Sequence, residues 1–351
     1  MASSPPKPAL GKTGVILPPI VFGTSSLGNL YQVIDPLVKR DIISEWFRQS
    51  DGIVAVDTAG KYGAGLALES IAESLTHLSI EPEQILISNK LGWRRVPLSG
   101  DEPTFEPGAW VGLEHDAVQD IGYEGILRCW TEGDELLSPY RADFVSVHDP
   151  DEYLAAATDD SDRESRWTDI LDAYRALGEL RDRGEVQAVG VGSKDWRVSQ
   201  RISNAVELDW VMLATSLTIY SHPPALLDFV ETLRQRQIAV INSAVFHAGF
   251  LMGGSFFDYR PVGNTPEDVA RLSWRERFHH VCADHAVAPA VACVAFGMSP
   301  PGVVATALSS SRPERIAEHV RLVDQKPPAE FWQSMVEAEL LENDVVETLL
   351  R

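Results

Sequence analysis

Residues 53–63, "IVAVDTAGKYG", join an apolar run of strand length to a carboxylate, Asp57, and a tyrosine five residues later, Tyr62. The run carries apolar side chains on both faces of the strand it would form, which is typical of a strand covered on both sides. Such strands occur mainly in parallel sheets whose faces are packed against helices. The stretch therefore predicts a buried parallel strand with polar residues directly after it.

Seven further short runs have the same character, and each is followed by a segment with helical periodicity. They cover residues 20–24, 85–90, 143–149, 186–192, 210–216, 239–245 and 302–308. Residues 163–184 show the helical pattern clearly and end in basic residues before Gly184, a common helix stop. Eight strands alternating with helices predict an α/β fold, most economically a closed (β/α)8 TIM barrel. An open doubly wound sheet is the alternative.

No repeat or low-complexity linker divides the 351 residues, so we predict one domain over residues 1–351. Its barrel would occupy about residues 9–323, and residues 324–351 would form a helical tail. Two long connections, residues 92–116 and 247–268, are expected to be loops that cover the site. The acidic run 159–165 reads as a solvated loop.

Composition restricts the partners that this chain can have. Its net charge is −21, which disfavours nucleic acid and anionic membrane surfaces. The first residues lack the apolar segment of a signal peptide, so a cytoplasmic location is expected. Cys129, Cys282 and Cys293 are odd in number and widely spaced, which predicts free buried thiols and no metal site.

Polar residues stand at the ends of three neighbouring predicted strands. Asp57 ends the second strand, Lys90 the third and His148 the fourth, while Tyr62 follows Asp57 in the next loop. Taken singly, each has a structural explanation, such as a helix cap, a surface lysine or a core histidine. The carboxyl ends of barrel strands share one mouth, and a buried lysine without a function is costly. The four together therefore favour chemistry over architecture.

Seven segments that follow one another along the chain resemble the aldo-keto reductase family. They are "LGKTGVILPPIVFGTSSLGN", "VDTAGKYG", "ISNKLG", "SVHDPDEY", "GEVQAVGVGSKDW", "INSAVFHAGFL" and "RPERIAEHV". The resemblance implies a (β/α)8 barrel opened by an N-terminal β-hairpin, and a nicotinamide dinucleotide as cofactor. It also implies a catalytic tetrad of Asp57, Tyr62, Lys90 and His148.

The chemistry of such a tetrad follows from its groups. Moving a hydride onto or off a carbonyl carbon requires proton transfer at the oxygen, and an ordinary phenol is a weak acid. At about 4 Å and an effective dielectric near 20, the Lys90 charge is worth roughly 4 kcal/mol to a phenolate, before solvent screening. Asp57 would keep Lys90 charged and aimed, and His148 would hydrogen-bond and orient the substrate oxygen.

The resemblance also implies residues that hold the cofactor. These are Gly23, Thr24, Ser193, Tyr220, Ser243, Phe246, Gly249, Ser310, Arg315, Glu318 and His319. The chain departs from the family pattern at Lys194, where asparagine is common, and at Ser309, where a lysine commonly reaches the 2′-phosphate of NADP. His319 also replaces the usual asparagine. These departures weaken a preference for NADP, so we expect NAD to be preferred or both to be used.

Three segments, "FGTSSLGNLYQ", "YEGILRCW" and "VGVGSKDW", are similar to a bacterial sugar-dehydrogenase branch of the family, which includes L-fucose or D-threo-aldose 1-dehydrogenase and pyridoxal 4-dehydrogenase. This implies oxidation of a sugar hemiacetal to a lactone. Aromatic and charged loop residues suit a polyol, and the candidates for substrate contacts are Trp93, Arg94, Phe105, Trp110 and Asp149.

Two other functions stay open on the sequence. An NADPH-dependent reductase of aldehydes or ketones would share all four tetrad residues. A cofactor-binding regulatory or scaffold subunit could use the same barrel and acidic surface, although it would not need an intact tetrad. The sequence leaves homo-oligomerisation open as well.

Overall fold

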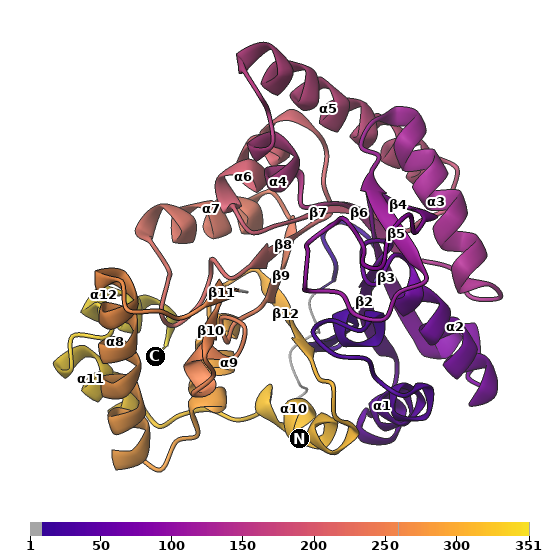
Figure 1. The fold of residues 1–351 in the computed structure, drawn as a ribbon. Coiled ribbons are helices and arrows are strands. Elements are labelled where there is room, and N and C mark those ends of the chain that lie inside the picture. The colour runs from indigo at the N-terminus through magenta and orange to yellow at the C-terminus, as the bar shows by residue number, and fades with distance from the viewer. Residues whose placement is uncertain (1–8, 259, 351) are drawn as a thin grey trace.

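The strands of the molecule close into a parallel barrel, as the computed structural model shows for the residues it describes, 9–258 and 260–350 (Figure 1). Around the barrel they follow the order β1-β12-β9-β8-β7-β6-β3-β2. The eight strands are β1 (Ile20–Gly23), β2 (Val54–Ala59), β3 (Ile85–Leu91), β6 (Phe144–His148), β7 (Ala188–Ser193), β8 (Trp210–Ala214), β9 (Ala239–Ser243) and β12 (Val303–Ser309). The barrel prediction is confirmed. Pairing of β1 with β12, from Ile20–Thr306 to Gly23–Ser309, closes it and excludes the open sheet.

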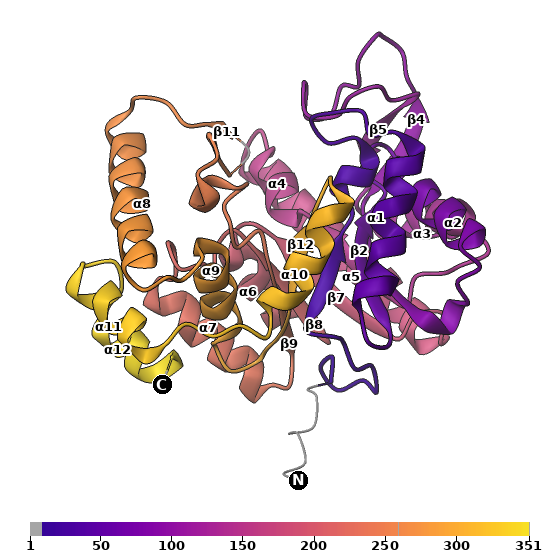
Figure 2. The same ribbon diagram turned by 90° about the horizontal axis from the view of Figure 1, so that it is seen from below.

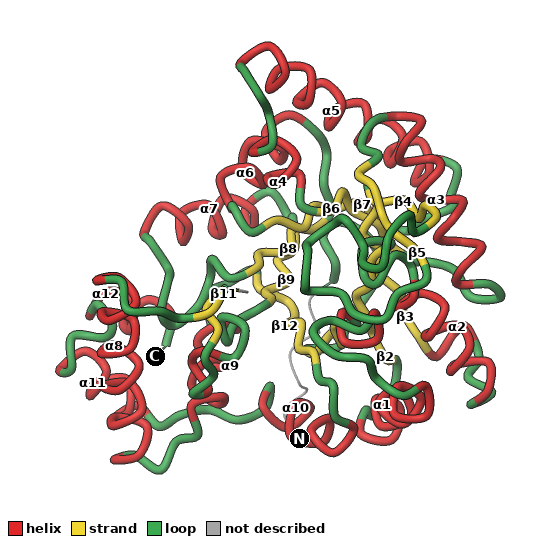
Figure 3. The backbone as a smooth tube through the Cα atoms, in the orientation of Figure 1, coloured by secondary structure: helices red, strands yellow, loops and turns green. Residues whose placement is uncertain are grey.

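Helices surround the strands, as the colouring by secondary structure makes plain (Figure 3). One helix after each barrel strand forms the ring: α1 (Pro36–Gln49), α2 (Leu66–His77), α3 (Tyr123–Leu137), α5 (Asp160–Asp182), α6 (Trp196–Ala205), α7 (Pro224–Gln235), α9 (Pro289–Met298) and α10 (Ile316–Leu322). The expectation of a solvated loop at 159–165 is wrong. Asp159 caps α5 by accepting a hydrogen bond from the Asp162 backbone, and the acidic first turn suits a helix start.

The barrel interior is filled by side chains, so it is a core and not a channel. Phe144 and Trp210 meet edge to face inside it, with ring centroids 5.6 Å apart. Leu10, Val15 and Leu17 belong to the same buried cluster and come from the segment before β1. That segment turns back on itself through a single antiparallel bridge, Ala9–Ile16, where the resemblance implied a β-hairpin.

Both long connections contain structure of their own. Residues 92–116 were expected to be a loop, but β4 (Trp93–Pro97) pairs there with β5 (His115–Gln119). Residues 247–268 contain the pair β10 (Phe256–Phe257) and β11 (Arg260–Pro261). Figure 2 shows β4 and β5 at the opposite end of the barrel from the segment that precedes β1. The hairpin therefore rises above the mouth where the strands end.

Further helices lie outside the ring. They are α4 (Pro150–Ala155), α8 (Pro266–Asp284), α11 (Ala329–Glu337) and α12 (Asn343–Leu349). Phe331, Trp332 and Met335 of α11 are buried in one apolar cluster with Phe278 of α8. No single described helix is long and apolar enough to cross a membrane, and only α8 with α9, bent by 101°, passes that test as a pair. The three cysteines are free and buried, as predicted.

The position of Tyr62 depends on two glycines. A Cβ on Gly28 would lie 2.6 Å from the Tyr62 carbonyl carbon, and one on Gly63 would lie 2.4 Å from the Gly28 oxygen. Gly63 also has φ of +66°, a region that side chains other than glycine rarely adopt. The turn after β1 thus packs directly on the backbone that carries Tyr62.

We predict that Gly28→Ala destabilises the protein by about 1–3 kcal/mol, because the new methyl group must displace backbone atoms. Gly14→Ala is the matched control, since a Cβ there meets nothing within 4 Å, and it should change stability by less than about 0.5 kcal/mol. Urea unfolding followed by circular dichroism measures both. Equal stability of the two variants would show that the close packing on Tyr62 is not a constraint.

Candidate active site

Three of the four predicted catalytic residues project from adjacent barrel strands into the same buried place. Asp57 of β2, Lys90 of β3 and His148 of β6 are only 4%, 3% and 3% exposed. Parallel pairing sets them side by side, because Asp57 lies opposite Ser88, and Lys90 opposite Ser146 two residues before His148. The Lys90 ammonium pairs with Asp57 Oδ2, while Ser88 donates a hydrogen bond to Asp57 Oδ1 at 3.1 Å.

Tyr62 completes the group from the loop after β2. The Lys90 ammonium lies 4.7 Å from the centre of its ring, and the His148 ring meets it edge-on at 5.5 Å. The structure thus brings Asp57, Tyr62, Lys90 and His148 together, as expected from the strand ends. A buried cation beside a phenol stabilises the anion that the phenol leaves when it gives up its proton. Their catalytic role stays a prediction.

His148 is held in its neutral form by its surroundings. Burial lowers the pKa of His148 well below its ordinary value, and the charges of Lys90 and Lys61 add to the effect. Its Nδ1 has no hydrogen-bond partner, whereas Nε2 lies 3.5 Å from Asp149 Oδ2. A neutral imidazole that carries its proton on Nε2 can donate a hydrogen bond from this nitrogen to a substrate oxygen.

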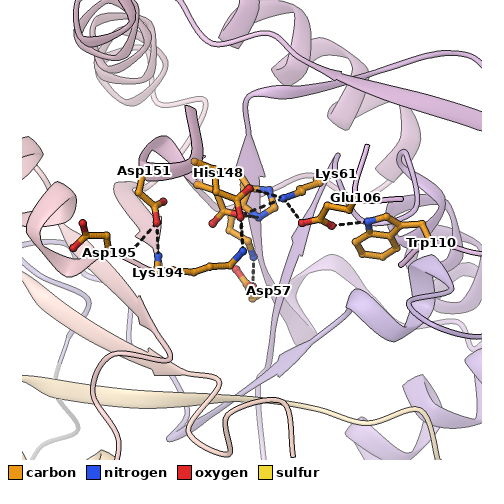
Figure 4. A network of polar contacts seen from close by, with 11 residues as sticks. Asp57, Lys61, Glu106, Trp110, His148, Asp151, Lys194 and Asp195 are labelled. Atoms are coloured by element: carbon orange, nitrogen blue, oxygen red, sulfur yellow. Dashed lines mark hydrogen bonds and ion pairs between the residues drawn. The ribbon is translucent and has the colours of Figure 1, made fainter. Parts of the chain in front are cut away.

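A second buried lysine lies next to the tetrad (Figure 4). Lys61 precedes Tyr62, and its side chain is 3% exposed. Its ammonium contacts Glu106 Oε1 at 2.7 Å, Glu152 Oε2 at 3.0 Å and Asp149 Oδ2 at 3.3 Å. Burial acts to lower the pKa of Lys61, but Asp149, Glu106 and Glu152 together outweigh it and raise that pKa. The lysine is therefore charged.

Residues after β7 join this network. The Lys194 ammonium pairs with Glu152 Oε1 at 2.5 Å and lies 3.9 Å from Asp149 Oδ2. Asp151 accepts hydrogen bonds from the backbones of Lys194 and Asp195. Burial and the nearby Asp149 carboxylate raise the pKa of Asp151 to about 6. Lys194, which departs from the family pattern, thus lies next to the carboxylates of Glu152 on α4 and of Asp149 just before it.

Sequence reasoning missed Lys61, Glu106, Asp151 and Glu152. Lys61 could have been recognised in the sequence, because in residues 53–63 it stands between the predicted buried strand and Tyr62. The carboxylates could not, since Glu106 comes from the β4–β5 connection and Glu152 from α4, and only the fold brings them to Lys61.

The predicted cofactor residues at strand ends lie on the side of the barrel mouth formed by β1, β12, β9, β8 and β7, which borders the tetrad strands at both ends. Gly23 ends β1, Ser193 ends β7 and Ser243 ends β9, and Thr24 follows β1. Thr24 and Ser193 already hydrogen-bond within the chain, to the carbonyls of Asp57 and Asp195. Ser216, just beyond β8, has a buried hydroxyl without a partner, which an extended ligand along this side could satisfy. These residues fit a dinucleotide, and their role in binding it stays a prediction.

The remaining predicted cofactor residues lie on loops and at the start of α10. Tyr220 packs edge-on against His247, Phe257 and Trp274, which is the packing of a core aromatic residue. Phe246 is partly buried beside that cluster, and Gly249 begins a short 3-10 turn. Ser310 accepts a hydrogen bond from Ser26. Three more lie at the start of α10: Arg315 and Glu318 are exposed, and His319 is buried.

Among residues 9–258 and 260–350, no group of three histidine, cysteine or acidic side chains is placed to hold a metal ion.

The three aromatic residues among the predicted substrate contacts, Trp93, Phe105 and Trp110, form a row that ends at Tyr62. Ring centroids are 5.8 Å apart for Trp93–Phe105, 6.0 Å for Phe105–Trp110 and 5.9 Å for Trp110–Tyr62. Asp149 lies in the Lys61 network, whereas Arg94 is engaged in an ion pair with Asp120 at 3.1 Å. The structure therefore brings Trp110 and Asp149 close to Tyr62 and His148, and leaves Arg94 with a structural partner.

Comparisons with known proteins agree with this geometry. The model of the aldo/keto reductase family matches residues 19–339. Pyridoxal 4-dehydrogenase of Microbacterium luteolum is 26% identical over 343 residues, covering 94% of this chain and 96% of the relative. D-threo-aldose 1-dehydrogenase of a Pseudomonas species is 24% identical over 360 residues, covering 95% and 98%.

Solved structures show the same fold. An aldo-keto reductase of Bacillus halodurans in its holo form superposes with a TM-score of 0.68 at 17% identity, covering 95% of each chain. A glycerol dehydrogenase of Gluconobacter oxydans gives 0.69 at 15% identity, covering 96% of this chain and 94% of the other.

The neutral state of His148 predicts a pH dependence of stability. Because its pKa is lower in the folded chain, the unfolded chain binds a proton that the folded chain rejects, so stability is lost as pH falls below about 6.5. Between about pH 7 and pH 5, the free energy of unfolding should fall more steeply for the parent than for His148→Gln, by up to about 1.4 kcal/mol per pH unit. Urea unfolding at a series of pH values measures this, and equal slopes would contradict a neutral His148.

Proposed function

The chain belongs to the aldo/keto reductase family of oxidoreductases, and from this membership and its site we propose that it is an NAD-dependent dehydrogenase that oxidises the C1 hemiacetal of an aldose to a lactone. The observation that carries the proposal is the buried Lys90–Asp57 pair beside Tyr62, with a neutral His148 on the same side. These groups supply a proton acceptor for a substrate hydroxyl and a donor that orients it.

Each residue has one task in this mechanism. His148 donates a hydrogen bond from Nε2 to the C1 oxygen and fixes its direction. Tyr62, as the phenolate, takes the hydroxyl proton as the hydride leaves C1. A bound nicotinamide would supply the acceptor for this hydride. Lys90 stabilises the phenolate before this transfer, and Asp57 holds the ammonium in place. In the reverse direction the Tyr62 phenol returns the proton to the carbonyl oxygen.

Two features support an aldose as the substrate. The relative from Pseudomonas is named for D-threo-aldose, and it matches this chain along nearly its whole length. The mouth above the tetrad combines aromatic faces with carboxylates, as a polyol requires, since sugar rings stack on aromatic side chains and hydroxyl groups donate to carboxylates.

The aromatic row also favours a second candidate substrate, a flat aromatic aldehyde. The row places the centroids of successive rings 5.8–6.0 Å apart, in the order Trp93, Phe105, Trp110 and Tyr62. The relative from Microbacterium is named for pyridoxal, whose aldehyde and neighbouring hydroxymethyl group can close into a cyclic hemiacetal. Oxidation of that hemiacetal to a lactone would use the same proton and hydride transfers.

A spectrophotometric screen tests these proposals against each other. The purified protein is given NAD or NADP with L-fucose, D-arabinose, other aldoses or pyridoxal, and reduced cofactor is followed by its absorbance; NADPH with simple aldehydes tests reduction. Aldose oxidation with NAD supports the leading proposal, and activity on pyridoxal alone favours the second. Reduction of apolar aldehydes with NADPH alone would replace both with an aldehyde reductase.

We predict that NADH binds at least as tightly as NADPH. Ser309 is exposed at the end of β12 and supplies no positive charge for a 2′-phosphate, while Arg315 could accompany either cofactor. Dissociation constants from fluorescence quenching should be lower for NADH or within about tenfold of each other, a difference of about 1.4 kcal/mol. Binding of NADPH about a hundredfold tighter than NADH would overturn the prediction. Ser309→Lys should shift the ratio toward NADPH.

We predict that Tyr62→Phe lowers turnover at least about a hundredfold, since it removes the proton-transferring oxygen and keeps the ring. Cofactor affinity and melting temperature should stay close to the parent. Lys90→Met should also abolish most activity, because nothing then stabilises the phenolate. Tyr140→Phe is the matched control, as Tyr140 hydrogen-bonds the Ile80 carbonyl at 2.7 Å and should affect stability alone. Near-parental turnover of Tyr62→Phe would contradict the mechanism and show that another group transfers the proton.

A further inference from the structure

Lys61 links the two sides of the substrate position. Toward Tyr62, it pairs with Glu106, whose other oxygen accepts a hydrogen bond from Trp110 Nε1 at 2.7 Å, and Trp110 stacks on Tyr62. Figure 4 shows this chain running from Lys61 through Glu106 to Trp110. Toward His148, the same ammonium holds Asp149 Oδ2. Lys61 is thus linked to a neighbour of Tyr62, Trp110, and to a neighbour of His148, Asp149. Tyr62 and His148 are the two groups proposed to contact the reacting oxygen.

Asp149 is fixed in a conformation that its contacts must maintain. Its backbone has φ of +47°, which is unfavourable for a residue with a side chain. Its amide donates to the Gly192 carbonyl at 3.1 Å, and its carboxylate is held by Lys61. Asp149 Oδ2 is thereby kept 3.5 Å from His148 Nε2.

The spacing determines what Asp149 can recognise. An oxygen that accepts a hydrogen bond from His148 Nε2 is the reacting oxygen itself. Asp149 Oδ2 lies 3.5 Å from that nitrogen. The reacting oxygen gives its only proton to Tyr62 in the proposed mechanism, so the hydrogen bond that Asp149 accepts comes from the next nearest substrate oxygen, the one on the neighbouring carbon. A carboxylate accepts hydrogen bonds and donates none, so this second oxygen must belong to a hydroxyl group.

The net charge of the residues around Lys61 also favours a ligand with hydroxyl groups. Asp149, Glu152 and Glu106 supply three negative charges, and Lys61 and Lys194 supply two positive charges, so these five groups leave one negative charge beside His148, and Asp151 adds a second when it is ionised. Such a site repels a substrate that carries a phosphate or carboxylate there. It suits a neutral polyol, whose hydroxyl groups gain charge-assisted hydrogen bonds.

We infer that Asp149 and Lys61 form a specificity subsite for the hydroxyl group on the carbon next to the reacting carbon. Asp149 accepts that hydroxyl, and Lys61 is a positioning residue that holds Asp149 in place without touching the substrate. The inference rests on the proposed aldose oxidation and extends it, because it requires a neutral substrate with a hydroxyl group at C2.

The test compares kcat/KM for an aldose and its 2-deoxy analogue in the parent, Lys61→Met and Asp149→Asn. A hydrogen bond to a charged group predicts that the parent prefers the aldose by about tenfold to a hundredfold. Both variants should lose most of this preference, mainly through a higher KM for the aldose, so that kcat/KM for the aldose falls toward that for the 2-deoxy analogue. Lys39→Met is the control, because Lys39 is also buried, at 5% exposure, but belongs to α1. It should keep the parental preference.

The outcomes separate the subsite from the proposed function. If the parent oxidises no aldose, the aldose proposal and the subsite both fall. If it oxidises the aldose and the 2-deoxy analogue equally well, the subsite alone is wrong. A parental preference in Lys61→Met would remove Lys61 from the account, and if that variant does not fold, Asp149→Asn decides alone whether the subsite exists.

Discussion

A lysine buried in a protein must be matched by carboxylates, and two such lysines shape the mouth of this barrel. Lys90 pairs with Asp57 on the neighbouring strand. Lys61 pairs with Glu106 of the β4–β5 connection and with Glu152 of α4. The first pair needs the parallel pairing of β2 with β3, which sets the two side chains side by side. The second needs the loops above the strands to fold inward. Desolvated charges of this kind are costly unless they are fully paired, so their retention points to chemistry.

The two lysines divide the work between reaction and recognition. Lys90 lies under the Tyr62 ring, where its charge acts on the group proposed to move the proton. Lys61 pairs with Asp149 and Glu106 and is linked through Glu106 to Trp110, the group of residues that we propose for substrate recognition. Both charges also lower the pKa of His148 and keep it a neutral hydrogen-bond donor. The proposed mechanism therefore applies to an aldose and to other cyclic hemiacetals, and the loop residues would decide between them.

Much of the fold could be predicted because its signals are local in sequence. The eight strands follow from apolar runs alternating with helical segments, and the tetrad follows from polar residues at strand ends, which a barrel brings to one mouth. An acidic run is equally compatible with a solvated loop and with the start of a helix, so the sequence does not distinguish the two at residues 159–165. The pairing of β4 with β5 is likewise not evident from the sequence of residues 92–116. The Lys61 network could not be predicted, since Glu106 comes from the β4–β5 connection and Glu152 from α4, and the positions of both depend on tertiary packing.

The central claim is that the buried Lys90–Asp57 pair exists for the reaction at Tyr62. The most direct test is the rate of hydride transfer in a single turnover, measured for Asp57→Asn with cofactor bound and with the substrate that the activity screen identifies. The account predicts a fall of at least about a hundredfold, with nearly unchanged cofactor affinity, while the exposed Asp41→Asn keeps the parental rate. A parental rate of hydride transfer in a folded Asp57→Asn enzyme would contradict it.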